Sequence, residues 1–347
     1  MDLTPSEINE MLPFLLRREN VARYEDGAVV IGNRSKYPFE RSFVRCTDVE
    51  CVAKAIEDMV TQGGGPSNAA LYTLVMVACQ TEKQPKPLRR SIMEAASKRL
   101  IKTRPTNTAL ARRLDLAMQV VYRTLEEGGD VEPTLLAWIE NFRDKTARDY
   151  AIAGEFGASL IEDGDGILTM CFAETSFLLA LAMAQKSGKR IQVFTPETRP
   201  YLQGARLTAP SVHELGIPVN IIGDNMPAYV LSQGKVQKYF TAADLVTLDG
   251  HVVNKVGTFQ NAIAASYHRV PYFVFSWGPD KQKPDRASIE IEERDPGEMR
   301  SCRGQPTTDP NIGAYYPAFD ITPPHLVSGV ITQFGILSPY DLARFFG

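Results

Sequence analysis

The chain has 347 residues, of which 44% are hydrophobic and 23% charged, a composition typical of a globular protein with room for two domains. Its net charge of −3 provides no long-range attraction for nucleic acid or an anionic membrane, so neither is expected as a partner. The longest apolar stretches, residues 69–79 and 177–184, are well short of the roughly 20 residues that span a bilayer. The first ten residues lack the pattern of a secretory signal, and we expect a cytoplasmic protein.

The first 150 residues predict a mainly helical N-terminal domain. Apolar residues recur at helical spacing in several segments, and a Gly-Gly-Gly-Pro breaker precedes one of them. The predicted elements are a strand at 28–31 and helices at 48–60, from Pro66 to about Cys79, and from Pro105 to the Gly128-Gly129 stop.

After residue 150, short apolar strands alternate with segments of helix length. This rhythm predicts a second domain, 151–347, with a mainly parallel sheet covered on both faces, Rossmann-like in architecture. The chain is therefore assigned to the α/β class, with a helical N-terminal domain followed by a Rossmann-like C-terminal domain. The predicted strands are 166–170, 191–195, 219–222, 239–242 and 270–275, and the predicted helices include 175–185 and 257–268.

Cofactor and metal sites leave no recognisable trace in the sequence. Neither a G-x-G-x-x-G turn nor a G-x-x-x-x-G-K-[ST] loop is present, so a dinucleotide or nucleoside triphosphate is not expected. The four histidines lie far apart and none stands at metal-ligand spacing from a cysteine, so no metal is expected either. Five scattered cysteines do not suggest a disulfide framework.

Ligands of parallel α/β sheets bind beyond the carboxyl ends of the strands, which singles out two reactive side chains. Cys171 follows the first strand and Asp244 follows the fourth. Each also has an ordinary interpretation, because a cysteine there is commonly a small buried apolar residue and an aspartate a helix cap or turn former.

Three further features combine into a possible phosphate site. Asn254 and Lys255 precede a predicted helix, whose N-terminus attracts anions, and Arg104 lies at the start of another. The turn formed by Gly63, Gly64 and Gly65 can present successive backbone N–H groups to an anion. The alternatives are a capping asparagine, solvated cations and a simple linker.

Several segments match, in order, a known family. They are Glu197–Thr208 (ETRPYLQGARLT), Asp224-Asn225-Met226, Asn254–Thr258 (NKVGT), Ile291–Pro296, Pro317–Pro323 and Thr103–Thr106 (TRPT). On these segments the chain resembles the methylthioribose-1-phosphate isomerases from about residue 40 onward. The resemblance implies a helical domain followed by a Rossmann-like domain, assembled as a homodimer, with no metal or organic cofactor.

The resemblance also implies site residues. It assigns catalysis to Cys171 and Asp244, and contacts with a sugar phosphate to Arg104, Gln203, Asn254 and Lys255. Two departures stand out. The family usually has Arg-Gly-Ala before the proline where this chain has Gly63-Gly64-Gly65, so backbone N–H groups are expected to replace one cation. The family commonly has Asn-Ala-Gly after the cysteine, where this chain has Phe172-Ala173-Glu174, which suggests a related enzyme with a shifted substrate.

The expected function is the isomerisation of a 5-modified ribose 1-phosphate to the ribulose 1-phosphate. The candidate substrates are 5-methylthioribose 1-phosphate, of methionine salvage, and 5-deoxyribose 1-phosphate, of 5-deoxyadenosine salvage. Phe172 beside the cysteine favours the compact 5-deoxy sugar. Ribose 1,5-bisphosphate ranks last, because no second basic cluster is present. A different class also remains open, since the regulatory subunits of the exchange factor for eukaryotic translation initiation share this fold without catalysis.

Overall fold

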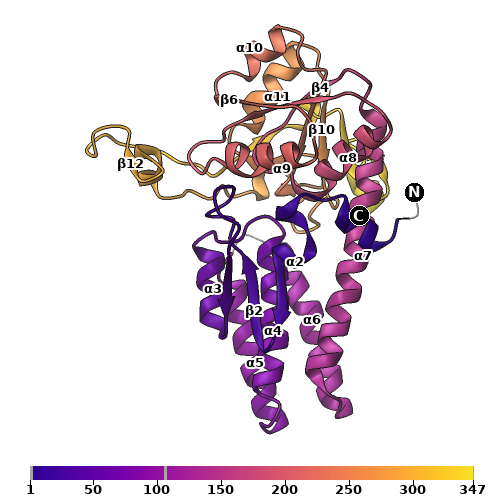
Figure 1. Ribbon diagram of the computed structural model, residues 1–347, viewed down its shortest axis with the longest axis vertical. Helices are drawn as coiled ribbons and strands as arrows, with labels where there is room; N and C mark the ends of the chain where they lie inside the picture. The colour runs from indigo at the N-terminus through magenta and orange to yellow at the C-terminus, as the bar shows by residue number, and fades with distance from the viewer. Residues whose placement is uncertain (1–2, 105–107, 347) are drawn as a thin grey trace. The chain divides into compact units, whose positions relative to one another are not determined.

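The computed structural model describes residues 3–104 and 108–346 (Figure 1). The chain folds as two compact units, which are treated separately below. The N-terminal unit consists of residues 5–10 and 14–148, and the C-terminal unit consists of 149–346 with the short segments 3–4 and 11–13. The predicted helix start at Pro105 falls outside the described residues.

The N-terminal unit combines a three-stranded antiparallel sheet, in the order β1-β2-β3, with helices that account for most of its residues. The predicted helices are confirmed as α3, α4 and the described part of α6, and the predicted strand as β2. The bounds are α1 Pro5–Glu10, η1 Phe14–Leu16, α2 Arg18–Val21, β1 Ala22–Glu25, β2 Ala28–Gly32, β3 Phe43–Cys46, α3 Val49–Glu57, α4 Gly65–Gln80, α5 Lys86–Ile101, α6 Thr108–Glu127 and α7 Val131–Leu160, of which α7 continues into the C-terminal unit.

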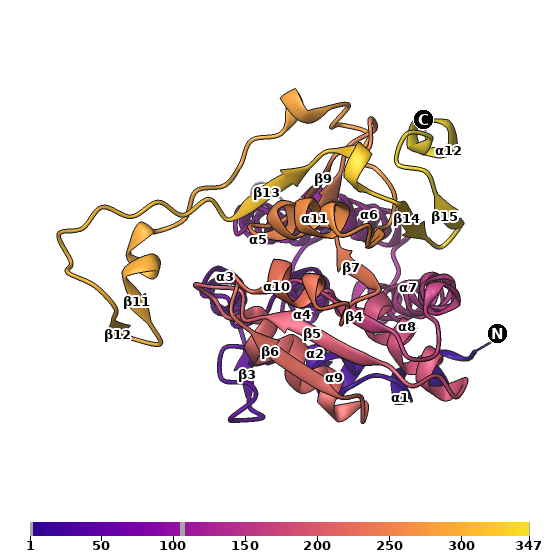
Figure 2. The same cartoon turned by 90° about the horizontal axis from the view of Figure 1, so that it is seen from above.

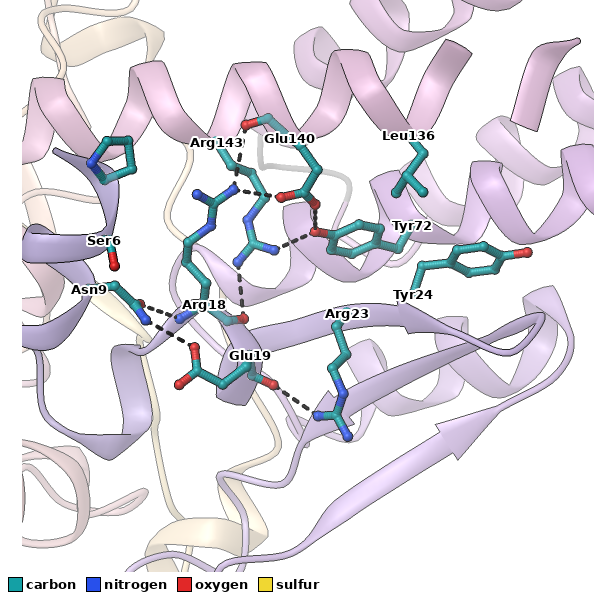
Figure 3. Close-up of a pocket in the computed structure, with 11 residues that line it drawn as sticks. Ser6, Asn9, Arg18, Glu19, Arg23, Tyr24, Tyr72, Leu136, Glu140 and Arg143 are labelled. Atoms are coloured by element: carbon teal, nitrogen blue, oxygen red, sulfur yellow. Dashed lines mark hydrogen bonds and ion pairs between the residues drawn. The ribbon is translucent and has the colours of Figure 1, made fainter. Parts of the chain in front are cut away.

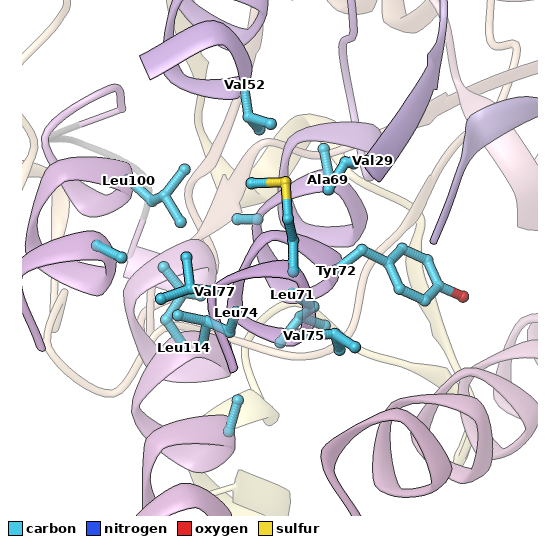
Figure 4. Packing of buried hydrophobic residues seen from close by; sticks show 14 of the residues in the cluster. Val29, Val52, Ala69, Leu71, Tyr72, Leu74, Val75, Val77, Leu100 and Leu114 are labelled. Carbon is cyan, nitrogen blue, oxygen red and sulfur yellow. The ribbon is translucent and has the colours of Figure 1, made fainter. Parts of the chain in front are cut away.

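Helix α4 is the centre of this unit's core. Its side chains are buried on nearly every side, as expected of an apolar helix surrounded by other elements. Figure 4 shows Leu71, Leu74 and Val75 of α4 among residues from α3, α5, α6 and β2. Packing of this kind explains why the segment contains almost no charge.

One feature of this unit corrects the sequence analysis. Cys46, at the end of β3, forms a disulfide with Cys51 in α3, and their Cα atoms are 5.4 Å apart. The side chain of Asp48 accepts a hydrogen bond from the Cys51 backbone N–H at the start of α3. This cap turns the chain sharply enough for two cysteines five residues apart to meet.

The C-terminal unit contains a seven-stranded sheet in the order β15-β14-β10-β7-β4-β5-β6, parallel except for β15. All five predicted strands are present, as β4, β5, β6, β7 and β10, which confirms the predicted α/β class and parallel sheet. The bounds are β4 Gly166–Leu168, α8 Glu174–Lys186, β5 Gln192–Pro196, η2 Gly204–Thr208, α9 Ala209–Glu214, β6 Val219–Ile222, α10 Pro227–Ser232, β7 Lys238–Ala242, α11 Thr258–Tyr267, β10 Tyr272–Phe275, β14 Gly329–Thr332, β15 Gly335–Leu337 and α12 Leu342–Phe346.

Helices cover both faces of this sheet (Figure 2). Phe177 of α8 packs on Phe240 and Phe275, whereas Tyr239, which points to the opposite face, donates a hydrogen bond to the carbonyl of Thr258 in α11. Adjacent residues of β7 thus serve opposite faces, as the period of a strand requires. Their burial on both faces accounts for the continuous apolar runs in the sequence.

A second, antiparallel sheet was not expected from the sequence. It contains β8 Leu245–Val246, β9 Val252–Lys255 and β13 Phe319–Thr322, in the order β13-β9-β8. Between β10 and β13 the chain makes a long excursion, tipped by the short strands β11 Ser301–Cys302 and β12 Gln305–Pro306, which projects from this unit in Figure 1. Its remaining elements are η3 Arg286–Ser288 and η4 Pro296–Arg300, and η5 Pro324–Leu326 follows β13.

Candidate active site

Cys171 lies just beyond the carboxyl end of β4 in a strained backbone conformation. Its φ is +62°, a left-handed value that non-glycine residues adopt at an energetic cost. Two threonine hydroxyls hold it there: Thr198 Oγ1 accepts a hydrogen bond from the Cys171 backbone N–H at 3.3 Å, and Thr208 Oγ1 donates one to the Cys171 carbonyl. The backbone of the cysteine is therefore fixed on both sides.

The segments that match the family explain this arrangement. Asp224 accepts hydrogen bonds from the backbone N–H groups of Thr198 and Arg199, both at 2.7 Å. Thr198 itself has a left-handed φ of +64°, and so does Leu202 at +62°. The carboxylate of Asp224 thus secures the strained turn that carries the Thr198 hydroxyl to Cys171.

Asp244 follows β7, and its backbone N–H donates to the carbonyl of Val253 at 3.0 Å. The side chain remains accessible to solvent, yet the surrounding protein desolvates it enough to raise its pKa. Lys255 and Arg294 oppose this rise, and Glu174 and Glu292 reinforce it.

The same environment acts on the half-buried thiol of Cys171. Desolvation raises its pKa to about 11, Lys255 opposes the rise, and Asp244 adds to it. Lys255 acts on the pKa of both Cys171 and Asp244, which indicates that the thiol, carboxyl and ammonium groups predicted from the sequence lie near one another. At neutral pH the free thiol keeps its proton.

Asn254 and Lys255 precede helix α11, as the sequence predicted, but their strand was not predicted. They lie within β9, in the antiparallel sheet, rather than after a strand of the parallel sheet. The amide of Asn254 donates to Thr258 Oγ1 at 3.0 Å. Lys255 is buried with its ammonium 4.8 Å from the centre of the Phe319 ring, and this ammonium makes no hydrogen bond or ion pair among the described residues. Desolvation lowers its pKa, so a bound anion would stabilise its charged form.

The N-terminus of α11, expected to contribute N–H groups to a phosphate, is already occupied. Asp320 of β13 accepts hydrogen bonds from the backbone N–H of Gly257 at 2.7 Å and from that of Phe259 at 3.1 Å. A carboxylate at this position satisfies the donors that an anionic ligand would need. The contribution of this helix end to a phosphate site is therefore not supported.

Gln203, another expected substrate contact, is buried at the start of the π-helical turn η2. Its side-chain oxygen has no hydrogen-bond partner within residues 3–104 and 108–346. Buried polar atoms are nearly always paired in folded proteins. An unpaired acceptor at this position is suited to accept a hydrogen bond from a hydroxyl group of a ligand.

The remaining candidates belong to the N-terminal unit. Gly63 has a left-handed φ of +59°, and the Gly65 N–H donates to the carbonyl of Gln62 at 3.0 Å within the turn that also includes Gly64. Arg104 donates to the carbonyl of Ile56 at 3.2 Å and also contacts the sulfur of Met59. These contacts show how each residue is held within its own unit, and their role toward a ligand stays a prediction.

Sequence reasoning missed Arg294. Its guanidinium pairs with Glu292 at 2.9 Å and lies 5.9 Å from the same Phe319 ring that Lys255 covers. Phe319 is paired with Lys255 across β13 and β9, so the two cations share one aromatic surface. The residue lies within the matched segment 291–296, and that match was the only sequence signal available for it.

A pocket of about 420 Å³ in the N-terminal unit does not contain the thiol and carboxyl groups (Figure 3). Its central charged groups are bound to one another: Arg18 pairs with Glu140 at 2.7 Å, and the hydroxyl of Tyr72 contacts both Glu140 and Arg143. No cluster of three His, Cys, Asp or Glu side chains suited to a metal occurs in the described part of either unit.

The sequence is similar to one family of known proteins. The family model described as "Initiation factor 2 subunit family" matches residues 66–339, most of the sequence. The chain belongs to this family. Within it, the methylthioribose-1-phosphate isomerase of Pelotomaculum thermopropionicum is 34% identical over 333 residues, covering 91% of this chain and 90% of the relative. The enzyme of the same name from Chloroflexus aurantiacus is 36% identical, covering 92% and 95%.

Solved structures of the family carry two kinds of name. The 5-methylthioribose 1-phosphate isomerase of Pyrococcus horikoshii OT3 superposes with a TM-score of 0.85 at 28% identity, covering 99% of this chain and 97% of that one. The translation initiation factor eIF-2B, subunit delta, of A. fulgidus gives 0.81 at 29% identity, covering 93% and 96%. Proteins with this fold carry both names, so the function of this chain has to be inferred from the residues of its site.

No described helix is both long and apolar enough to cross a membrane.

Proposed function

We propose that this chain is an aldose–ketose isomerase that converts a 5-modified ribose 1-phosphate into the corresponding ribulose 1-phosphate. The observation that carries the proposal is the cluster of Cys171, Asp244 and Lys255 in a chain similar to named isomerases. We also propose a cytoplasmic homodimer, which light scattering on the purified protein would test.

Lys255 supports a phosphate ester as the substrate. A buried ammonium with no hydrogen-bonded anion is costly, and a phosphate oxygen would offset that cost. Arg294 adds a second positive charge to the same cluster. Together they place positive charge beside the thiol and carboxyl groups, as a sugar 1-phosphate requires.

Ring opening is the step we assign to Asp244. A sugar 1-phosphate cannot open by losing its anomeric proton, because that oxygen carries the phosphoryl group. The ring oxygen must be protonated instead, and the raised pKa of Asp244 favours the neutral carboxyl group that can do this. The proton remains on the 4-oxygen of the open-chain product.

We propose direct hydride transfer from C2 to C1 as the second step. Abstraction of the C2 proton would need a thiolate, and the raised pKa of Cys171 makes thiolate scarce at neutral pH. In the hydride route the C1–O4 bond breaks, the hydride leaves C2 for C1, and the proton of the 2-hydroxyl group passes through the Cys171 thiol to the Asp244 carboxylate, which is thereby reprotonated as the C2 carbonyl forms. With substrate deuterated at C2, full retention of deuterium at C1 is expected, and exchange with solvent would indicate the proton route.

Two substrates remain candidates. The names of the relatives support 5-methylthioribose 1-phosphate. Phe172, half-buried and adjacent to Cys171 in sequence, supports the smaller 5-deoxyribose 1-phosphate, because a bulky residue at this position leaves less room for a 5-substituent. Comparison of kcat/KM for these sugars and ribose 1,5-bisphosphate on the purified chain would rank them.

The decisive experiment measures turnover in matched variants. Cys171→Ser and Asp244→Asn should each abolish detectable isomerisation with an unchanged melting temperature, whereas Cys302→Ser, a half-buried free cysteine of the same unit, should retain it. Wild-type rates in either of the first two variants would overturn the assignment. Inactivity of the wild type on all three sugars would instead favour a non-catalytic subunit, as the likeness to eIF-2B subunit delta allows.

A further inference from the structure

Tyr316 has a buried hydroxyl group without a partner. Its side chain is only 3% exposed, and within the described residues the hydroxyl makes no hydrogen bond of normal geometry, with the Arg294 guanidinium beside it. Tyrosine hydroxyls buried in proteins usually find a partner. An unpaired one costs folding free energy unless a ligand completes it.

The surroundings of this hydroxyl are those of the candidate active site. The backbone N–H of Arg294 donates to the Tyr316 carbonyl at 3.0 Å, so the two residues are held side by side. Desolvation raises the pKa of Tyr316 to about 12, the guanidinium of Arg294 opposes that rise, and Glu298 and Cys171 add to it. The phenol therefore remains protonated, and the charge of Arg294 acts on this hydroxyl and on the Cys171 thiol alike.

We propose that the Tyr316 hydroxyl donates a hydrogen bond to an oxygen of the bound sugar phosphate, beside the Cys171 thiol. The unpaired oxygen of Gln203 gives the complementary half of this recognition, since it accepts a hydrogen bond where Tyr316 donates one. A pentose phosphate carries both acceptor oxygens and donor hydroxyls. This inference rests on the proposed isomerase function.

The test uses the full chain and the variant Tyr316→Phe, which removes one oxygen atom and keeps the ring. We expect kcat/KM for 5-methylthioribose 1-phosphate, or for the preferred sugar, to fall about tenfold or more. The melting temperature should stay the same or rise, because the lost hydroxyl was unpaired in the free protein. A residue with a packing role alone would not separate activity from stability in this way.

Tyr272→Phe is the matched control. Tyr272 is equally buried, but its hydroxyl is 2.7 Å from Thr241 Oγ1, so its removal leaves Thr241 unpaired. This variant should lower the melting temperature and leave kcat/KM unchanged. We therefore expect Tyr316→Phe to lower kcat/KM without lowering the melting temperature, and Tyr272→Phe to lower the melting temperature without changing kcat/KM.

Failures of the two proposals are distinguishable. An active wild type with unchanged kinetics in Tyr316→Phe would overturn the role of Tyr316 and leave the isomerase function standing. If the wild type binds the sugar phosphates calorimetrically without turning them over, weaker binding by Tyr316→Phe would uphold the contact while the isomerase function fails. Absence of both turnover and binding would overturn both.

Discussion

Asp320 provides a quantitative test of the electrostatics described above. Its carboxylate accepts hydrogen bonds from Gly257 and Phe259, but desolvation outweighs them and raises its pKa from 3.8 to about 6. The folded chain therefore binds this proton more tightly than the unfolded chain, by about 2 pKa units. At about 1.4 kcal/mol per unit, the difference is worth about 3 kcal/mol.

The sign follows from the direction of the shift. The stabilising contribution of the protonated Asp320 is fully present below the unfolded pKa of 3.8 and is lost as the pH rises through 6. Asp320→Asn does not titrate. The free energy of unfolding of the wild type minus that of the variant should therefore fall by up to about 3 kcal/mol between pH 4 and pH 7.

Urea unfolding followed by tryptophan fluorescence measures this difference. The chain has two tryptophans, and a Trp138→Phe background leaves Trp277, which packs on Tyr150 with ring centres 4.5 Å apart and reports on the C-terminal unit. Asp341→Asn, at an exposed position, serves as the control. A wild-type-minus-Asp320→Asn difference that is constant from pH 4 to 7, or that grows with pH, would refute the reasoning.

Three other predictions address the site and the fold. Glu174→Gln should move the alkaline limb of the kcat/KM profile to lower pH, because the charge of Glu174 supports the raised pKa of Asp244; an unmoved limb would contradict this coupling. Thr198→Val should lower kcat about tenfold or more while the chain stays folded by circular dichroism, because it removes the hydroxyl that fixes Cys171, the proposed catalytic residue. A wild-type kcat would argue against that role. Gly157→Ala should lower the free energy of unfolding, measured in urea, by about 1–3 kcal/mol, because its Cβ would lie 2.5 Å from Phe275. An unchanged free energy of unfolding would mean that helix α7 shifts to make room without cost.

The parallel sheet was predictable because its strands are recognisable from their residue pattern. Strands buried on both faces are short runs of apolar residues, and β4 and β10 have that form. The antiparallel β9 was not predictable, since Asn254 and Lys255 precede Gly257 and a helix, the usual pattern of a capped loop. Only the pairing with β13, distant in sequence, reveals the strand.

The site was predictable to the extent that it follows strand ends. Cys171 and Asp244 each come just after a strand of one sheet, and such positions meet at one edge. Tyr316 gave no such signal, because it lies in an irregular excursion and its importance comes from an unpaired hydroxyl. Neither periodicity nor spacing encodes which polar atoms remain without partners after folding.

The left-handed backbone conformation limits how far the thermal stability of this protein can be raised without loss of function. It occurs at Cys171, Glu174, Thr198 and Leu202. Each such residue costs about 1–2 kcal/mol that glycine would not incur. At the half-buried Cys171, substitution by glycine would therefore be favoured in a selection for heat resistance, whereas at the buried Thr198 and Leu202 the packing lost would outweigh the relief of strain. Glycine at Cys171 would remove the thiol, so under the proposed mechanism a heat-resistant variant selected without an activity screen is expected to lack isomerase activity.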